Sequence, residues 1–140
     1  MLRKIKTIQE KIESGRGHLY RVVSKNDSTS AQSHQMGLYI DKRFWSVCFD
    51  ERCKKGTNTF RIANVDWYDG KSSLGIRFGH YGKGRKDEYR ITRINRSFEI
   101  GMAIVLVRMT ADDYYGFVLT SFAERQAFNE LQLQKLLDIG

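Results

Sequence analysis

The sequence predicts one mainly β domain of six to eight short strands with helices at its edges, in the barrel or sandwich class. The chain has 140 residues, a length at which one domain buries roughly two thirds of its unfolded surface. Hydrophobic residues make up 41% and aromatic residues 12%, enough for a packed core and too many for a disordered tail. Short apolar stretches alternate with turn residues, without internal repeats and without proline. We therefore expect residues 1–140 to form a single domain.

The first half of the chain is expected to hold a short helix and several strands. Apolar residues at positions 2, 5, 8 and 12 have near-helical spacing and predict a helix over residues 3–14, ended by Ser14-Gly15. Strands are predicted at His18–Val23 and Met36–Ile40, separated by the small polar loop Ser24–Ser33, and Lys42–Phe49 is compatible with helix or strand.

The second half of the chain predicts paired strands. A common hairpin turn pair, Asp69-Gly70, separates two alternating apolar stretches, although the loop between them is longer than two residues. The predicted strands are Thr59–Trp67, Leu74–Phe78, the clearly buried Met102–Met109 and, after a turn at Asp112-Asp113, its antiparallel neighbour Tyr114–Thr120.

The C-terminal segment Ser121–Ile139 predicts an amphipathic helix that closes one end of the barrel. Ser121 can cap this helix, and Glu124, three residues later, completes a capping box. The apolar face is expected to contain Phe122, Phe128, Leu131 and Leu136.

Positive charge is concentrated in residues 71–96. The net charge of +8 and the sequence pI near 9.6 favour anionic partners, with nucleic acid first and an anionic membrane surface second. Eight Lys or Arg against two acids give this segment +6 of that total. Glycines and tyrosines interrupt the run, so Arg77–Arg96 is expected to form a loop or arm flanked by strands. Such an arm suits nucleic acid, because Lys and Arg release counterions from phosphates and Arg can bond guanine. The alternative is a solvated charged loop.

The sequence shows no targeting segment and no strong metal site. No apolar run approaches a membrane span, and the N-terminus lacks the apolar core of a signal peptide, so we expect a cytoplasmic protein without a membrane partner. Cys48 and Cys53 have no second pair and no nearby His, which favours two reduced thiols. The three histidines, His18, His34 and His80, do not have metal-ligand spacing.

Catalytic motifs are also weak. Asp50, Asp69 and Lys71 fit loosely the acid…acid-x-Lys pattern of metal-dependent nucleases, but Asp69-Gly70 has a sufficient structural reason as a hairpin turn. No nucleophile elbow and no phosphate-binding loop motif is present. The sequence therefore favours a binding protein over an enzyme, and we expect no cofactor for this domain.

Two motifs, about forty residues apart, form a specific pair. The first is a Ser-x-Asn-Asp loop that leads to a His-Gln-x-Gly-Leu-Tyr-Ile strand, here Ser24–Asp27 and His34–Ile40. The second is an aromatic-Gly-Lys turn followed by Arg, Glu and Arg-Ile-Thr-Arg, here Tyr81-Gly82-Lys83, Arg85, Glu88 and Arg90–Arg93. The pair resembles the N-terminal DNA-recognition, or effector, domain of EcoRII-type restriction endonucleases over roughly residues 18–120. The chain also resembles the recognition domain of a second restriction endonuclease, in which such a domain is joined to a separate catalytic half.

The resemblance implies a DNA-binding pseudobarrel, similar to plant transcription-factor domains, whose two arms enter the major groove of double-stranded DNA. The first arm would be about Ser24–Tyr39 and the second arm about Arg77–Arg96. Glu88 would accept from a cytosine amino group, or alternatively pair with a neighbouring arginine. His34 would contact DNA, or alternatively be a satisfied loop histidine. The expected DNA-binding residues are Ser24, Lys25, Asn26, Asp27, His34, Tyr39, Arg77, Lys83, Arg85, Lys86, Glu88, Tyr89, Arg90, Arg93 and Arg96.

The chain departs from the family pattern in both arms. One extra residue lies between Arg85 and Arg90, Tyr89 replaces a basic residue, and Gln32-Ser33 replaces a glycine pair. EcoRII reads CCWGG, where W is A or T, and related domains in other restriction enzymes read different sites. Retention of the Lys, Arg, Glu and Arg set makes CCWGG the expected site. Two unlike arms can approach both halves of a short site without a dimer partner, so we expect a monomer on DNA. The resemblance also implies a bacterial cytoplasmic protein with a Mg²⁺-dependent catalytic domain outside this chain.

Two other functions remain open from the sequence. One is a small metal-dependent nuclease that uses Asp50, Asp69 and Lys71. The other is an RNA- or single-strand-binding barrel that stacks bases on Trp67, Tyr81 and Tyr89.

Overall fold

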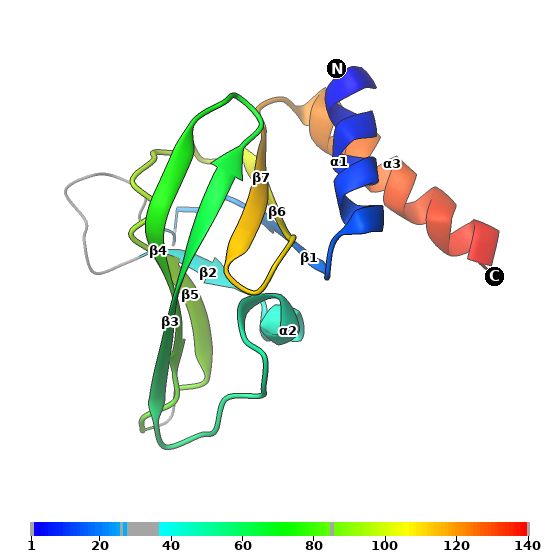
Figure 1. The fold of residues 1–140 in the computed structure, drawn as a ribbon. Coiled ribbons are helices and arrows are strands. Elements are labelled where there is room, and N and C mark those ends of the chain that lie inside the picture. Colours follow the sequence, from blue (N-terminus) through cyan, green and yellow to red (C-terminus); the bar gives the residue numbers. More distant parts are fainter. Residues whose placement is uncertain (1, 26, 28–36, 85, 140) are drawn as a thin grey trace.

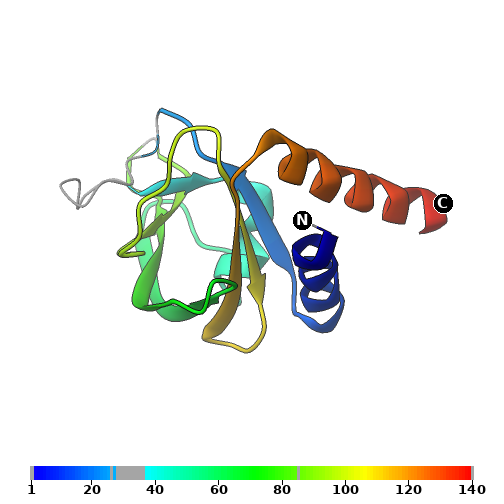
Figure 2. The same cartoon turned by 90° about the horizontal axis from the view of Figure 1, so that it is seen from above.

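Seven strands form one curled sheet in the computed structural model, which describes residues 2–25, 27, 37–84 and 86–139 (Figure 1). The strand order is β1-β6-β7-β3-β4-β5-β2, and every neighbouring pair is antiparallel except β3 and β7, which are parallel. Viewed from above, the sheet curves into a nearly closed barrel (Figure 2), which confirms the predicted fold class. The strands are β1 His18–Val22, β2 Leu38–Ile40, β3 Asn58–Trp67, β4 Ser72–Tyr81, β5 Glu88–Thr92, β6 Ala103–Arg108 and β7 Asp113–Leu119.

Two apolar layers hold the barrel together. The interior is filled by alternate residues of the strands, among them the fully buried Phe78 and Tyr114. A second layer lies outside the barrel, where α1 and α3 cover one side of the sheet. Because β6 lies between the two layers, all six of its residues are buried, which explains the uninterrupted apolar run in its sequence.

The two long helices lie side by side against β6 and β7 (Figures 1 and 2). They are α1 Leu2–Ser14 and α3 Phe122–Ile139, and an ion pair of 3.2 Å joins Lys4 of α1 to Glu124 of α3. Ser121 accepts from the backbone N–H of Glu124, as predicted for a cap, whereas the Glu124 carboxylate accepts from the N–H of Thr120 instead of Ser121. In the described part of the chain, no helix has the length and apolar character needed to cross a membrane.

The predicted role of α3 was wrong in two respects. The helix packs on the outside of the barrel and does not close its end. Of the expected apolar face, Phe128 is buried and Leu131 partly buried, but Phe122 and Leu136 are exposed. Leu136 is exposed because the C-terminal part of α3 extends beyond the edge of the sheet (Figure 1). Phe122 is the first residue of the helix, and its side chain faces solvent there.

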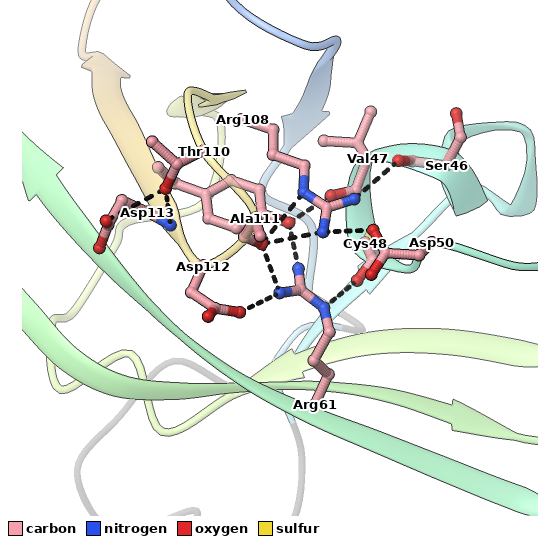
Figure 3. Close-up of polar contacts among 11 residues, drawn as sticks. Ser46, Val47, Cys48, Asp50, Arg61, Arg108, Thr110, Ala111, Asp112 and Asp113 are labelled. Atoms are coloured by element: carbon pink, nitrogen blue, oxygen red, sulfur yellow. Dashed lines mark hydrogen bonds and ion pairs between the residues drawn. The ribbon is translucent and has the colours of Figure 1, made fainter.

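The segment around α2 covers one end of the barrel, with Val47 and Cys48 in the core, and two arginines hold it there (Figure 3). The ambiguous segment 42–49 forms a short 3-10 helix, η1 Lys42–Phe44, and the one-turn helix α2 Trp45–Cys48. Arg61 of β3 donates to the carbonyl of Cys48 at 2.7 Å, and Arg108 of β6 donates to the carbonyl of Ser46 at 3.4 Å. Both guanidinium groups also donate to the carbonyl of Ala111, at 2.8 Å each, so they tie α2 to the turn between β6 and β7.

Candidate nucleic-acid interface

The second arm is a β-hairpin for most of its length, which corrects the expectation of a loop over Arg77–Arg96. β4 continues to Tyr81, and β5 pairs with it from Glu88, so only residues 82–87 form the turn. The sequence signal for a loop was misleading, because Gly79 lies within β4 and the charged residues of β5 occupy alternate positions. A short strand with charge on one face and apolar residues on the other needs no unbroken apolar run.

The turn of this hairpin is fixed to the segment that precedes β3. The carbonyl of Gly82 accepts from Gly56 at 2.7 Å, and the side-chain oxygen of Asn58 accepts from the N–H groups of Gly82 and Lys83 at 3.1 and 3.3 Å. A Cβ at Gly82 would lie 2.5 Å from the carbonyl oxygen of Thr57, so this close approach requires glycine. The basic turn is therefore held in place by bonds from its backbone to Gly56 and to the Asn58 side chain.

The outer face of β2, β5, β4 and β3 carries a row of aromatic and cationic side chains. Tyr39 pairs with Arg90 across β2 and β5, Arg90 lies opposite Gly79, and Gly79 lies opposite Phe60. We define the outer face by its residues Tyr39, Phe60, Arg77, Gly79, Tyr81, Glu88 and Arg90.

Aromatic rings hold the arginines of the outer face. The Arg90 guanidinium lies 4.7 Å from the ring centroid of Tyr39 and 4.8 Å from that of Tyr81. Arg77 lies 4.4 Å from the ring of Phe60 and donates to the Tyr81 hydroxyl at 3.3 Å. Such contacts are worth roughly 0.5–1 kcal/mol at exposed sites and about 2 kcal/mol when desolvated, and the Arg90 side chain is only 13% exposed. They orient the guanidinium groups through the ring faces and leave N–H donors for other partners.

Buried polar contacts fix the base of the first arm. The Asp27 carboxylate is fully buried and accepts from Arg21 at 2.7 Å, from the N–H of Ser24 at 2.9 Å and from the N–H of Tyr39 at 2.8 Å. Asp27 was expected to contact DNA, but a carboxylate that is enclosed in this way supports the arm from inside. Its network holds Tyr39 on the outer face.

Gly37 has a steric role in the same arm. A Cβ at this position would lie 1.9 Å from the carbonyl oxygen of Ile91 in β5, so the glycine of the His-Gln-x-Gly motif allows β2 to pair closely with β5. The expected contact residues Asn26, His34 and Arg85 lie outside the described residues.

Other expected contact residues divide into accessible and inaccessible ones. Lys25, Lys83, Lys86 and Arg93 are exposed, whereas Tyr89 retains only 6% of its accessible surface. Tyr89 was predicted to contact DNA, but its place in β5 turns the ring into the barrel, where it packs against Phe49 at 5.9 Å between centroids.

Arg96 lies far from the hairpin turn. It forms a bidentate contact with Asp69, at 3.2 and 2.7 Å, and this hydrogen bond lowers the pKa of the Asp69 carboxyl. Asp69 belongs to the turn between β3 and β4, at the opposite end of the ten-residue strand β4, which is up to about 30 Å long at 3.3 Å per residue. Arg96 is therefore not grouped with the outer face, although the sequence placed it in the second arm.

The structure also brings to the hairpin turn cationic residues that the sequence reasoning missed. Lys54 and Lys55 are exposed, and the bond between Gly56 and Gly82 holds their loop beside the turn. Lys42 lies 3.7 Å from the Asp87 carboxylate. The Lys54-Lys55-Gly56 run was the available signal, but its distance in sequence from the second arm hid the contact.

The structure does not bring together the residues expected for a nuclease site or for a base-stacking surface. Asp50 pairs with Arg108 at 2.7 Å, whereas Asp69 pairs with Arg96, and the described residues contain no group of three metal-ligating side chains. Trp67 and Tyr89, which were expected to stack bases, are buried in the barrel.

Comparison with known proteins agrees with the fold and the motifs. The structure is similar to the crystal structure of the B3 domain of UbaLAI restriction endonuclease with cognate DNA, with a TM-score of 0.54 and 17% sequence identity. The match covers 83% of this chain and 79% of that chain. No curated protein matches the sequence. The model of the family "Restriction endonuclease EcoRII, N-terminal" matches residues 14–104, and this chain therefore belongs to the EcoRII N-terminal domain family.

Proposed function

We propose that this chain binds double-stranded DNA sequence-specifically, as a monomer, with its two arms in the major groove. The observation that carries this proposal is the outer face, where Tyr39 from the base of the first arm lies against Arg90 of the second arm. Two unlike arms that meet at one surface can contact both halves of a short site without a second copy of the chain.

The chemistry of the outer face suits base recognition. Arg90 and Arg77 offer planar guanidinium donors, which match O6 and N7 of guanine, and Glu88 offers acceptors for the cytosine amino group. Exposed lysines beside the face, Lys54, Lys55, Lys83 and Lys86, supply charge for phosphates. Specificity and attraction would thus come from different residues of one surface.

Family membership extends the proposal to the larger protein. We infer that this domain recognises the target of a type II restriction endonuclease of the bacterial cytoplasm. Its catalytic domain, which would use Mg²⁺, lies elsewhere. The solved UbaLAI domain with its cognate DNA supports the DNA-binding part of this inference. The retained basic and acidic motif residues support CCWGG as the site.

Selection from random-sequence duplex DNA tests this function directly. We expect one short site of the CCWGG type to be enriched, and one chain per duplex by native mass measurement. Equal affinity for a CCWGG duplex and its scrambled version would refute specific recognition of that site, and enrichment of another sequence would replace it. Cutting of the duplex by this chain alone in Mg²⁺ would support the nuclease alternative.

A further inference from the structure

Asp87 is an acidic residue within the basic second arm, yet its carboxylate contacts the interior of the barrel. Its Oδ1 lies 2.8 Å from Nε2 of His80, a fully buried residue of β4. The Nδ1 atom of His80 is buried without a partner in the described part of the chain, so Asp87 provides the polar contact of this imidazole. The hydrogen bond from His80 is also the main cause that lowers the pKa of Asp87.

This contact bears on which residues of β5 face outward. Side chains of a strand alternate between its two faces, and His80 lies directly opposite Tyr89. The rings of His80 and Tyr89 pack at 4.7 Å between centroids. With Asp87 and Tyr89 both held on the inner side, Glu88 and Arg90 stand on the outer face. A slip of one residue would turn this pair into the barrel.

The hairpin turn is thus tied at both of its ends. Asn58 binds the N–H groups of Gly82 and Lys83 at the first end, and His80 binds Asp87 at the second. We propose that His80 and Asp87 are positioning residues for DNA recognition: their hydrogen bond fixes the register in which Glu88 and Arg90 face the DNA. This inference rests on the proposed function and adds to it two residues that need not touch DNA themselves.

Asp87 allows a test in which charge and positioning predict opposite results. Removing a negative charge from a DNA-binding surface strengthens binding to all sequences. Loss of a positioning contact weakens binding to the specific site. Asp87→Ala removes both the charge and the acceptor, whereas Asp87→Asn removes the charge but keeps an oxygen that can accept from His80. The two variants therefore differ mainly in the contact that we propose to matter.

The measurement is the affinity ratio between the best duplex from random-sequence selection and a scrambled duplex, at fixed salt. We expect Asp87→Ala to lower this ratio about tenfold, as for loss of one base contact, and Asp87→Asn to stay within about twofold of the unsubstituted chain. Hydrogen exchange of the β5 amides should accelerate in Asp87→Ala alone, in the absence of DNA. Equal ratios for the two variants, or tighter cognate binding by Asp87→Ala, would overturn the proposal. If the unsubstituted chain itself prefers no sequence, the proposed function fails instead. The hydrogen-exchange comparison then still shows whether the hydrogen bond between His80 and Asp87 holds β5 in place.

Discussion

Nη2 of Arg90 donates a 2.7 Å hydrogen bond to Oε2 of Glu88, two residues earlier on the outer face of β5. A local salt bridge was the alternative to a base contact for Glu88. Both can occur in turn, because the ion pair is weak enough for a base contact to replace it. Partly exposed ion pairs contribute about 0–1 kcal/mol, whereas a good contact to a base edge discriminates by about 1–3 kcal/mol. The ion pair can therefore orient both side chains in the free protein and be replaced by stronger contacts to bases in the DNA complex.

Substitution of this pair tests its role in specificity. Arg90→Ala and Glu88→Ala should each weaken cognate binding by about ten- to a hundredfold and reduce the preference over non-cognate DNA. Lys86→Ala is the matched control, because the loss of an exposed lysine that only attracts phosphates should weaken cognate and non-cognate binding equally. Titration of the selected and scrambled duplexes measures both effects. Uniformly tighter binding by Glu88→Ala would mean that Glu88 only repels phosphates.

The concentration of positive charge predicts a strong salt dependence. If about six phosphates are neutralised, the logarithm of the association constant should fall with a slope of roughly −5 against the logarithm of salt concentration. Lys55→Ala and Lys86→Ala should each reduce the slope by about one. The control is Lys6→Ala, since Lys6 is exposed on α1, on the opposite side of the sheet from the hairpin turn (Figure 1). An unchanged slope for Lys55→Ala would remove the 54–56 loop from the interface.

Local patterns predicted most of the strands and helices. The buried run of β6, the Asp-Gly turn between β3 and β4 and the cap of α3 each follow from short-range chemistry, and the structure confirms them. The sequence did not predict how far β4 extends or that β5 is a strand, because charged and large apolar residues alternate there in a glycine-rich segment. Sequence also did not reveal which elements cover which face, so α3 was expected at the end of the barrel.

The candidate site was predictable by composition and motif, but not in detail. The motif pair identified Tyr39, Glu88 and Arg90, which the structure brings together on one face. Tyr89 was misassigned because a strand register decides whether a tyrosine faces DNA or the core. Asp27 was misassigned because its partners include a backbone group twelve residues away. Long-range contacts of this kind leave no local signal in a single sequence.

The low pKa of Asp87 predicts how stability responds to acid. A carboxyl whose folded pKa lies below its unfolded value, about 3.9, stabilises the fold above that value and loses the contribution as pH falls through the folded pKa. The difference in unfolding free energy between the unsubstituted chain and Asp87→Asn should be constant above about pH 5 and shrink below about pH 4. Urea titrations across this range measure it. Parallel curves down to pH 2 would contradict the assigned shift.

The two thiols should differ in reactivity. Burial raises the pKa of Cys48 to about 12, and its side chain is inaccessible, whereas Cys53 is half-buried. A thiol reagent at pH 8 should therefore modify Cys53 and leave Cys48 unmodified until the chain unfolds. In Cys53→Ser, native protein should react hardly at all, and one thiol should appear in urea. Rapid labelling of native Cys53→Ser would show that α2, which contains Cys48, opens readily.

The closure of the barrel end predicts unequal effects for two partners of one ion pair. The Arg108 side chain is 5% exposed and that of Asp50 is 74% exposed, so only the arginine is withdrawn from water. Arg108→Met keeps an apolar stem but leaves the carbonyl of Ala111 with fewer donors and that of Ser46 without this one. Hydrogen bonds from a charged group contribute about 1.5–3 kcal/mol each, but Ser46 and Ala111 are exposed, so water can replace part of what their carbonyls lose. This variant should therefore lose about 1–3 kcal/mol of unfolding free energy. Asp50→Asn should change it by less than about 1 kcal/mol, since the carboxylate remains solvated. Urea unfolding of both variants measures these values, and equal losses would mean that the ion pair, not the carbonyl contacts, closes this end of the barrel.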